Sequence, residues 1–106
     1  MKDITVQELA EALKGNQTFT LLDVREDYEF EYGHLNCPCV HIPMGDLANR
    51  IHELDKERET YVMCKSGSRA AAVANFLKLN FGFTKTAMVI GGVEAYANEI
   101  DKTIKV

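Results

Sequence analysis

The sequence predicts an α/β fold in which a central, mostly parallel β-sheet is covered by helices on both faces. Segments with the composition of buried strands alternate along the chain with segments of helical periodicity. The chain has 106 residues, of which 46% are hydrophobic and 26% charged, a composition that can fill one hydrophobic core. No repeat, linker or low-complexity run interrupts the order of elements. We therefore expect a single domain over residues 1–106.

Local patterns predict the elements of the first half. Thr5 and Glu8 form a T-x-x-E capping box at the start of the first helix. An apolar, partly β-branched segment follows and is expected to be a buried strand. Further on, Leu47, Ile51 and Leu54 mark one face of a helix whose other face is charged. The expected elements are, in order, helix 4–14, strand 19–24, a short helical turn over 26–34, strand 39–43 and a helix around 47–54.

In the second half, an apolar strand leads through a short polar loop into an alanine-rich helix. Val73, Phe76 and Leu77 are expected on the buried side of this helix, because they recur at helical spacing. The alanines allow close approach to a sheet, and Gly82 is a plausible C-terminal cap. The expected elements are strand 59–64, helix 68–81, strand 85–92 and helix 93–100.

Charge and cysteine content exclude several classes of function. The net charge of −4 argues against binding to nucleic acid or to an anionic membrane. The first fifteen residues contain neither a signal-peptide core nor a transmembrane run, so the expected location is cytoplasmic. Three cysteines are too few for a disulfide framework, and the C-x-C pair has no second pair at zinc-finger spacing. We expect no metal and no organic cofactor.

The loop between the third expected strand and its helix is the candidate for chemistry. Cys64 ends the strand and is followed by a loop of donors and cations that comprises Lys65, Ser66, Gly67, Ser68 and Arg69. A thiolate at a helix N-terminus is stabilised by free backbone amides and by the positive end of the helix dipole. The alternative is an inert, buried cysteine, which leaves the glycine, the hydroxyls and the cations unexplained.

Three ordered motifs resemble the rhodanese-like sulfurtransferases. "CKSGSR" is similar to the active-site loop of that family, and "GFTKTAMVIGGVEAY" resembles its closing element. "LLDVREDYEFEYGHL" resembles the first signature of the family, with its characteristic positions at Asp23, Val24, Arg25, Glu29, Phe30, Gly33 and His34. The resemblance covers residues 5 to 100. It implies a three-layer α/β/α fold around a sheet of about five strands.

The resemblance also implies thiosulfate:cyanide sulfurtransferase chemistry. Cys64 would attack the outer sulfur of thiosulfate or another sulfane-sulfur donor, and the resulting persulfide would pass its sulfur to a thiol, to cyanide or to a sulfur-relay protein. The loop amides would stabilise the thiolate and persulfide anions, while Lys65 and Arg69 would meet the charged oxygens of the donor. Asp23 would support the loop from a neighbouring strand end, although a structural role is at least as compatible with its position.

Two alternative functions remain open. The first is a persulfide carrier or interaction module that a partner enzyme loads and that reacts weakly with thiosulfate. The second is a cysteine-dependent phosphatase, but phosphatase loops place five residues between cysteine and arginine, whereas four separate Cys64 from Arg69. A loop with one residue fewer should leave too little room for a phosphate group.

Several other residues are expected to have structural roles. Arg25 and Glu29 have the spacing of an ion pair on one face of a helical turn. His34 is expected to pack the turn that follows, and the Gly91–Gly92 pair is expected to form a tight turn near the loop.

The segment "GHLNCPCVHIP" departs from the usual family pattern, because it carries two additional thiols. Cys37 and Cys39 are either a resolving, redox-active pair or small side chains packed in the core, and we favour packing. Tyr96 stands where relatives commonly have tryptophan, so it keeps an aromatic ring and adds a hydroxyl.

Overall fold

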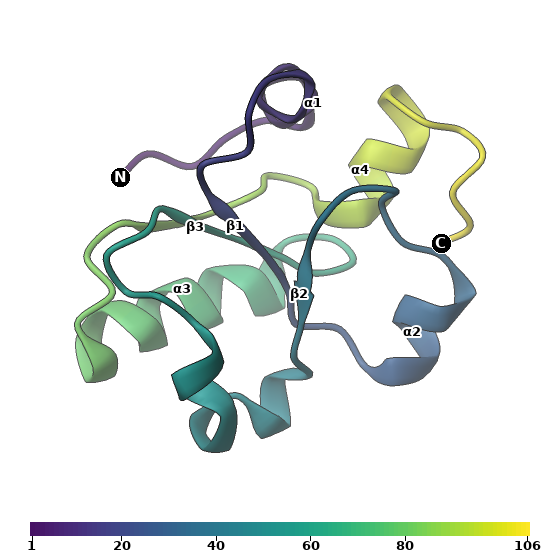
Figure 1. The fold of residues 1–106 in the computed structure, drawn as a ribbon. Helices are drawn as coiled ribbons and strands as arrows, with labels where there is room; N and C mark the ends of the chain where they lie inside the picture. The colour runs from purple at the N-terminus through teal and green to yellow at the C-terminus, as the bar shows by residue number, and fades with distance from the viewer.

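The computed structural model describes residues 1–106 and contains a parallel sheet between two layers of helices (Figure 1). The predicted α/β fold is therefore confirmed. The four strands, in the spatial order β2-β1-β3-β4, are β1 (Thr20–Asp23), β2 (Val40–His41), β3 (Thr60–Met63) and β4 (Thr86–Met88). The helices are α1 (Val6–Lys14), α2 (Asp27–Tyr32), α3 (Ser68–Phe81) and α4 (Gly92–Glu99), with the 3-10 turns η1 (Met44–Asp46) and η2 (Ala48–Glu53).

The sheet has four strands, so the expected number of about five was wrong. Residues before α1 add only an isolated parallel bridge between Ile4 and Val89. The Ile4 amide donates to the Met88 carbonyl at 3.1 Å, and the Ile90 amide donates to the Ile4 carbonyl at 2.8 Å. The next residue, Thr5, already caps α1, which leaves no length for a fifth strand.

Alternate residues of the buried strands point to opposite faces of the sheet and fill two separate cores. In β1, Leu22 faces the side covered by α3, whereas Leu21 faces the side covered by α1 and α4. Figure 1 shows α3 on one side of the sheet and the α1–α4 pair on the other. We call these the α3-side core and the α1/α4-side core.

Most elements form where the sequence predicts them. The Thr5–Glu8 capping box is present, with the Thr5 hydroxyl accepting from the Glu8 amide at 3.1 Å. The helix expected around 47–54 is instead the 3-10 turn η2, which is kinked at Arg50. On α3, Val73 and Leu77 are buried, whereas Phe76 is 37% exposed, so its predicted burial was wrong. No helix combines the length and the apolar character that crossing a bilayer requires.

Candidate active site

The carboxyl ends of the parallel strands lie along one edge of the sheet, where strand-to-helix loops come together. β1 ends at Asp23, β3 is followed directly by Cys64, and β4 leads into the Gly91–Gly92 turn. In the sheet register Asp23 pairs with Met63, so the Asp23 end of β1 lies beside the Cys64 end of β3. The strand order β2-β1-β3-β4 thus brings together segments that are far apart in the sequence.

The sulfur of Cys64 lies at the N-terminus of α3. Its Sγ atom accepts hydrogen bonds from the backbone amides of Gly67, at 3.1 Å, and Ala70, at 3.3 Å. Gly67 has a φ of 114°, a left-handed conformation that residues with a Cβ rarely adopt, and this turn aims its amide at the sulfur. Cys64 itself is fully buried, whereas Lys65, Ser66 and Ser68 are exposed. Two amide donors on one sulfur can stabilise a negative charge there.

The Gly91–Gly92 turn lies next to the Cys64 loop, as the sequence predicts, and contacts its backbone. The backbone amide of Val93 donates to the Cys64 carbonyl at 2.9 Å, and that of Glu94 donates to the Lys65 carbonyl at 3.0 Å. Gly92 has a φ of 61°, and a Cβ atom there would overlap both loop carbonyl oxygens. The N-terminus of α4 therefore provides hydrogen-bond donors for two carbonyls of the loop and fixes the position of the loop relative to α4.

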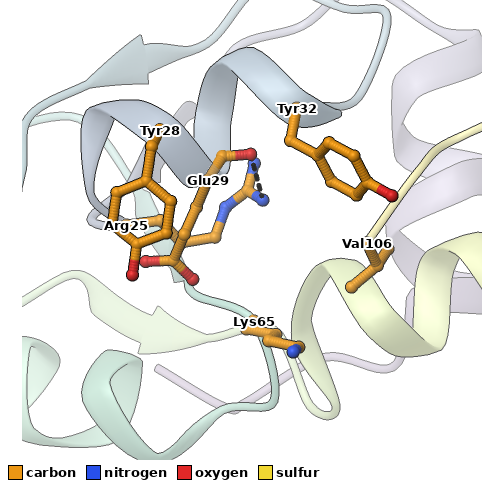
Figure 2. A pocket seen from close by; sticks show the side chains of 6 residues that line it. All are labelled: Arg25, Tyr28, Glu29, Tyr32, Lys65 and Val106. Atoms are coloured by element: carbon orange, nitrogen blue, oxygen red, sulfur yellow. Dashed lines mark hydrogen bonds between the residues drawn. The ribbon is translucent and has the colours of Figure 1, made fainter.

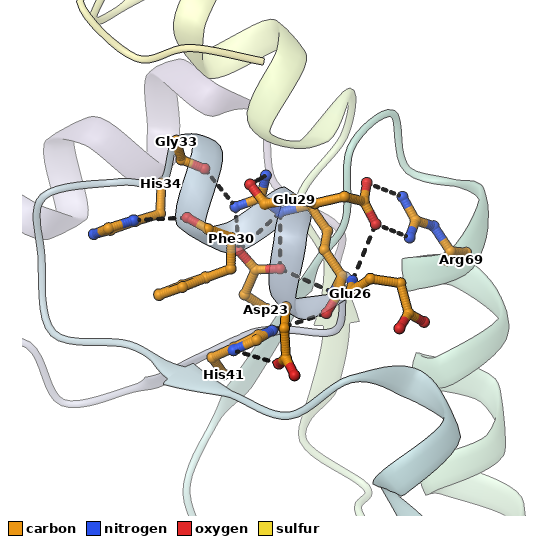
Figure 3. Close-up of polar contacts among 10 residues, drawn as sticks. Asp23, Glu26, Glu29, Phe30, Gly33, His34, His41 and Arg69 are labelled. Carbon is orange, nitrogen blue, oxygen red and sulfur yellow. Dashed lines mark hydrogen bonds and ion pairs between the residues drawn. The ribbon is translucent and has the colours of Figure 1, made fainter.

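Arg69 is held by a carboxylate of α2. Its two terminal nitrogens donate to the two Glu29 carboxylate oxygens at 2.7 and 2.9 Å (Figure 3). These hydrogen bonds to Arg69 lower the pKa of Glu29 from 4.5 to about 2, and the carboxylate in turn raises the pKa of Arg69. Arg69 therefore braces the loop and does not present a free guanidinium to a bound anion.

Arg25 pairs with Asp23, so the predicted Arg25–Glu29 ion pair was wrong. Its side chain donates to the Asp23 carboxylate at 2.8 to 3.1 Å, and both residues are buried. Its Nη1 and Nη2 atoms also donate to the backbone carbonyls of Glu29 and Gly33, at 3.2 and 2.9 Å. Asp23 makes none of its hydrogen bonds to the Cys64 loop. It holds Arg25, which anchors α2 and thereby positions Glu29.

The two histidines near α2 have structural contacts. His34 and His41 stack on opposite sides of the Phe30 ring, each with centroids 4.3 Å apart (Figure 3). The Nδ1 atom of His34 lies 2.9 Å from the Phe30 carbonyl oxygen, so His34 packs this turn as the sequence predicts. His41 contacts the Arg25 carbonyl oxygen through Nε2 at 2.8 Å.

Cys37 and Cys39 lie on the other side of the sheet from Cys64. Both are half-buried and pack against the α1/α4-side core, whereas Cys64 belongs to the α3-side core. Burial raises the pKa of the Cys37 thiol to about 11 and also raises that of Cys39. Tyr96 packs against the same core, and burial raises its pKa as well. This placement favours the packing interpretation of the two thiols.

A pocket of about 210 Å³ opens between α2 and the Cys64 loop (Figure 2). Its walls come from α2 and the segment just before it, from the residue after Cys64 and from the C-terminal segment. The lining residues are Arg25, Tyr28, Glu29, Tyr32, Lys65 and Val106. Sequence patterns had singled out Lys65 as part of the loop, but Tyr28, Tyr32 and Val106 carried no signal of their own. Only their spatial position reveals them.

A model of the family described as "Rhodanese-like domain" matches residues 5–99. The chain belongs to the rhodanese-like family. The Bacillus subtilis protein named "Putative sulfurtransferase YtwF" is 37% identical over 99 residues, which cover 93% of each chain. "Putative sulfur carrier protein YrkF" of the same organism is 30% identical, and the match covers 93% of this rhodanese-like chain and 52% of YrkF.

Solved structures agree with this membership. A rhodanese-like domain protein from Staphylococcus aureus superposes with a TM-score of 0.81 at 29% identity, covering 100% of this chain and 98% of that one. A rhodanese-related protein from Thermoplasma volcanium gives a TM-score of 0.81 at 28% identity, with 94% of each chain covered. The family and the names of these relatives support sulfur transfer as the general activity of this rhodanese-like chain.

Proposed function

We propose that the chain is a rhodanese-type sulfurtransferase whose nucleophile is Cys64. The observation that carries this proposal is the pair of backbone amides, from Gly67 and Ala70, that donate to the Cys64 sulfur at the start of α3. Donors fixed in this way stabilise an anion on sulfur without reorganisation during the reaction. They suit both the thiolate that attacks and the persulfide that results.

In the proposed first half-reaction, the Cys64 thiolate attacks the outer sulfur of thiosulfate. A new S–S bond forms at Cys64, the bond between the two sulfurs of thiosulfate breaks, and sulfite leaves with the electron pair. Lys65 contributes positive charge beside the path of the dianion. Cys64 is buried and the neighbouring residues Lys65, Ser66 and Ser68 are exposed, so the donor would approach the sulfur from their side of the loop. In the second half-reaction, cyanide or a thiol takes the outer sulfur of the persulfide.

Phosphatase activity is disfavoured by the position of Arg69. A phosphatase loop uses its arginine to bind phosphate oxygens, whereas both terminal nitrogens of Arg69 donate to Glu29. The four-residue spacing from Cys64 to Arg69 argues in the same direction. We expect no Cys64-dependent hydrolysis of p-nitrophenyl phosphate.

The name of the relative YrkF favours one alternative, in which the chain carries persulfide sulfur received from a partner enzyme. The carrier and the thiosulfate-dependent enzyme would share the Cys64 loop and differ in how it is loaded. Faster persulfide formation with a cysteine desulfurase than with thiosulfate would favour the carrier.

Intact-protein mass spectrometry tests the proposal. The wild type, Cys64→Ser and Cys37→Ser/Cys39→Ser proteins are each treated with thiosulfate and then with cyanide, while thiocyanate is assayed. We expect one added sulfur atom on the wild type and on the double variant, removed by cyanide as thiocyanate forms, and none on Cys64→Ser. A sulfur that persists on Cys64→Ser would overturn the assignment of the nucleophile. No gain from thiosulfate on any protein would favour the partner-loaded carrier.

A further inference from the structure

The outer side of α3 is apolar, although it faces away from the sheet. Val73 and Leu77 bury the inner side of the helix in the α3-side core. A helix that covers a sheet with one side usually carries charged and polar residues on the other. The outer side of α3 nevertheless exposes Ala72, Phe76 and Leu79. Together with Met44 of η1, we call these residues the outer α3 face.

The outer α3 face contains a groove of about 350 Å³ between α3 and the η1–η2 segment. All the residues that line it are apolar, namely Met44, Leu47, Ala72, Val73 and Phe76. The Phe76 ring is held by an edge-to-face contact with Phe81, with ring centroids 5.3 Å apart. Leu79 lies one helical turn beyond Phe76 and is 75% exposed. The face therefore combines a groove with a projecting apolar side chain.

The charges near this face favour a second copy of the chain as its occupant. The protein has a net charge of −4, yet α3 lies within residues 60–93, which contain no aspartate or glutamate. Arg69 is bound by Glu29, so Lys78 is the one unpaired charged side chain of the helix. A strongly charged partner would find no matching charges on α3. Two copies of an acidic protein repel each other least where the contacting helices carry no carboxylate.

The sizes of the side chains on α3 match in an antiparallel pair. Ala72 and Leu79 lie two helical turns apart on the same side of the helix, with Phe76 between them. A two-fold axis across the helix near Phe76 places Leu79 of each copy opposite Ala72 of the other. A large side chain then meets a small one at both ends, and the two helix dipoles run antiparallel. In a parallel pair, Leu79 would meet Leu79 and Ala72 would meet Ala72.

The apolar area of the face indicates a weak dimer. Met44, Phe76 and Leu79 are 43%, 37% and 75% exposed, which amounts to roughly 300 Å² per copy if a whole side chain of this size counts for about 150–200 Å². A standard stable interface buries about 800 Å² per partner, and transient interfaces bury less. The polar residues exposed on α3 add to the area and are Ser68, Asn75, Lys78 and Asn80. We therefore expect association between micromolar and millimolar concentration.

We propose that the outer α3 face binds a second copy of this chain and forms a weak two-fold dimer with the two α3 helices antiparallel. In this dimer, Leu79 of each copy fills the groove between Met44 and Phe76 of the other and lies against Ala72. The exposure of Phe76 then has a reason, because the ring forms a wall of the contact. The inference is independent of the proposed function, since no part of it involves the chemistry of Cys64.

Sedimentation velocity and NMR over a concentration series test the proposal. The full-length protein is measured from micromolar to millimolar concentration in reducing buffer, so that disulfides between copies do not contribute. We expect the sedimentation coefficient to rise toward that of a dimer, with concentration-dependent amide shifts centred on Ala72, Phe76, Leu79 and Met44. A protein that stays monomeric throughout would overturn the proposal and leave the face to a different protein. Shift changes confined to another surface would overturn it as well.

Charge variants test the antiparallel arrangement. Leu79→Glu and Ala72→Lys should each weaken the dimer by about tenfold or more, because each places two charges in an apolar contact. Both positions are exposed in the monomer, so the fold should be retained. An equimolar mixture of the two variants should associate more tightly than either alone, because the introduced glutamate then faces the introduced lysine. Ile100→Glu, at an exposed apolar residue outside α3, is the control and should leave the dimer intact.

The variants and the salt dependence also define the results that contradict the proposal. A dimer that survives Leu79→Glu would form through another surface, and a mixture that associates no better than the single variants would exclude the antiparallel arrangement. Added salt should leave the wild-type dimer unchanged or strengthen it, because salt screens the repulsion between two chains of net charge −4. Weaker association in salt would indicate a contact made by ion pairs and would exclude the outer α3 face.

Discussion

Glu29 and Arg69 form a bidentate ion pair that joins α2 to the end of the loop after β3, with N–O distances of 2.7 and 2.9 Å. The pair couples the first signature of the sequence to the candidate active-site loop, because α2 carries Glu29 and Arg69 lies in the first turn of α3, where the loop ends. Arg25, which is paired with Asp23, donates to the Glu29 and Gly33 carbonyls and so holds α2 in place. Two ion pairs therefore brace the loop. Glu29–Arg69 contacts the loop directly, whereas Arg25–Asp23 acts through α2.

The first prediction concerns the pH dependence of this brace. The hydrogen bonds from Arg69 lower the folded-state pKa of Glu29 from 4.5 to about 2, so the folded protein binds fewer protons than the unfolded chain between these values. The stabilisation from Glu29 is fully present above pH 4.5 and is lost as the pH falls toward 2. Urea unfolding of the wild type and of Glu29→Gln should differ most at neutral pH and converge in acid. A difference that stays constant over this range would contradict the prediction.

The second prediction concerns the buried pair. Asp23→Asn should destabilise the protein by about 3 to 5 kcal/mol, because it leaves the Arg25 guanidinium buried without its counter-charge. Thermal or urea unfolding at pH 7 measures this loss. Glu53→Gln, which breaks the exposed Arg50–Glu53 pair, is the matched control and should change stability little. Equal effects of the two substitutions would argue against burial as the cause.

The third prediction uses two threonines that are neighbours in the sheet. Thr60 and Thr86 pair in register and are both fully buried, yet the Thr86 hydroxyl has no hydrogen-bond partner, whereas the Thr60 hydroxyl donates to the Arg58 carbonyl at 3.3 Å. Thr86→Val should stabilise the protein by about 1 kcal/mol by removing an unsatisfied group. Thr60→Val should give no such gain, and equal stabilisation by both would show that hydroxyl pairing is irrelevant here.

The fourth prediction concerns the support under the Cys64 loop. Gly92→Ala should lower stability by at least about 1 kcal/mol, because the residue has positive φ and its methyl group would press on the Cys64 and Lys65 carbonyls. The same change should slow persulfide formation, measured by mass spectrometry after thiosulfate. Gly45→Ala is the control, since a Cβ atom there meets nothing within 4 Å. Normal loading of the Gly92→Ala protein would mean that the turn does not set the loop geometry.

Local sequence patterns predicted much of this fold but not its long-range pairings. The capping box of α1 and the span 68–81 of α3 follow from residues close together in sequence, and both are confirmed. Arg25 pairs with Asp23 and not with Glu29, because Glu29 is bound by Arg69, which lies far away in the sequence and reaches Glu29 only in the folded protein. The kink at Arg50 and the exposure of Phe76 likewise depend on tertiary packing, which spacing alone does not determine.

The site itself was only partly predictable for the same reason. The glycine and the helix start next to Cys64 indicated amide donors, and the structure supplies them from Gly67 and Ala70. The pocket is different, because Tyr28, Tyr32 and Val106 meet only through the docking of α2 and the C-terminal segment. Nothing in their spacing signals a common surface.

The dependence of the Cys64 loop on α4 has a consequence for protein synthesis. The amides that cap the Cys64 and Lys65 carbonyls belong to Val93 and Glu94, which leave the ribosome well after the cysteine does. A nascent chain that still lacks α4 therefore leaves the Cys64 and Lys65 carbonyls without these two donors. If Cys64 is the nucleophile that we propose, its loop has its full set of backbone contacts only once α4 has docked, and the reactivity of Cys64 would then report whether a molecule has folded.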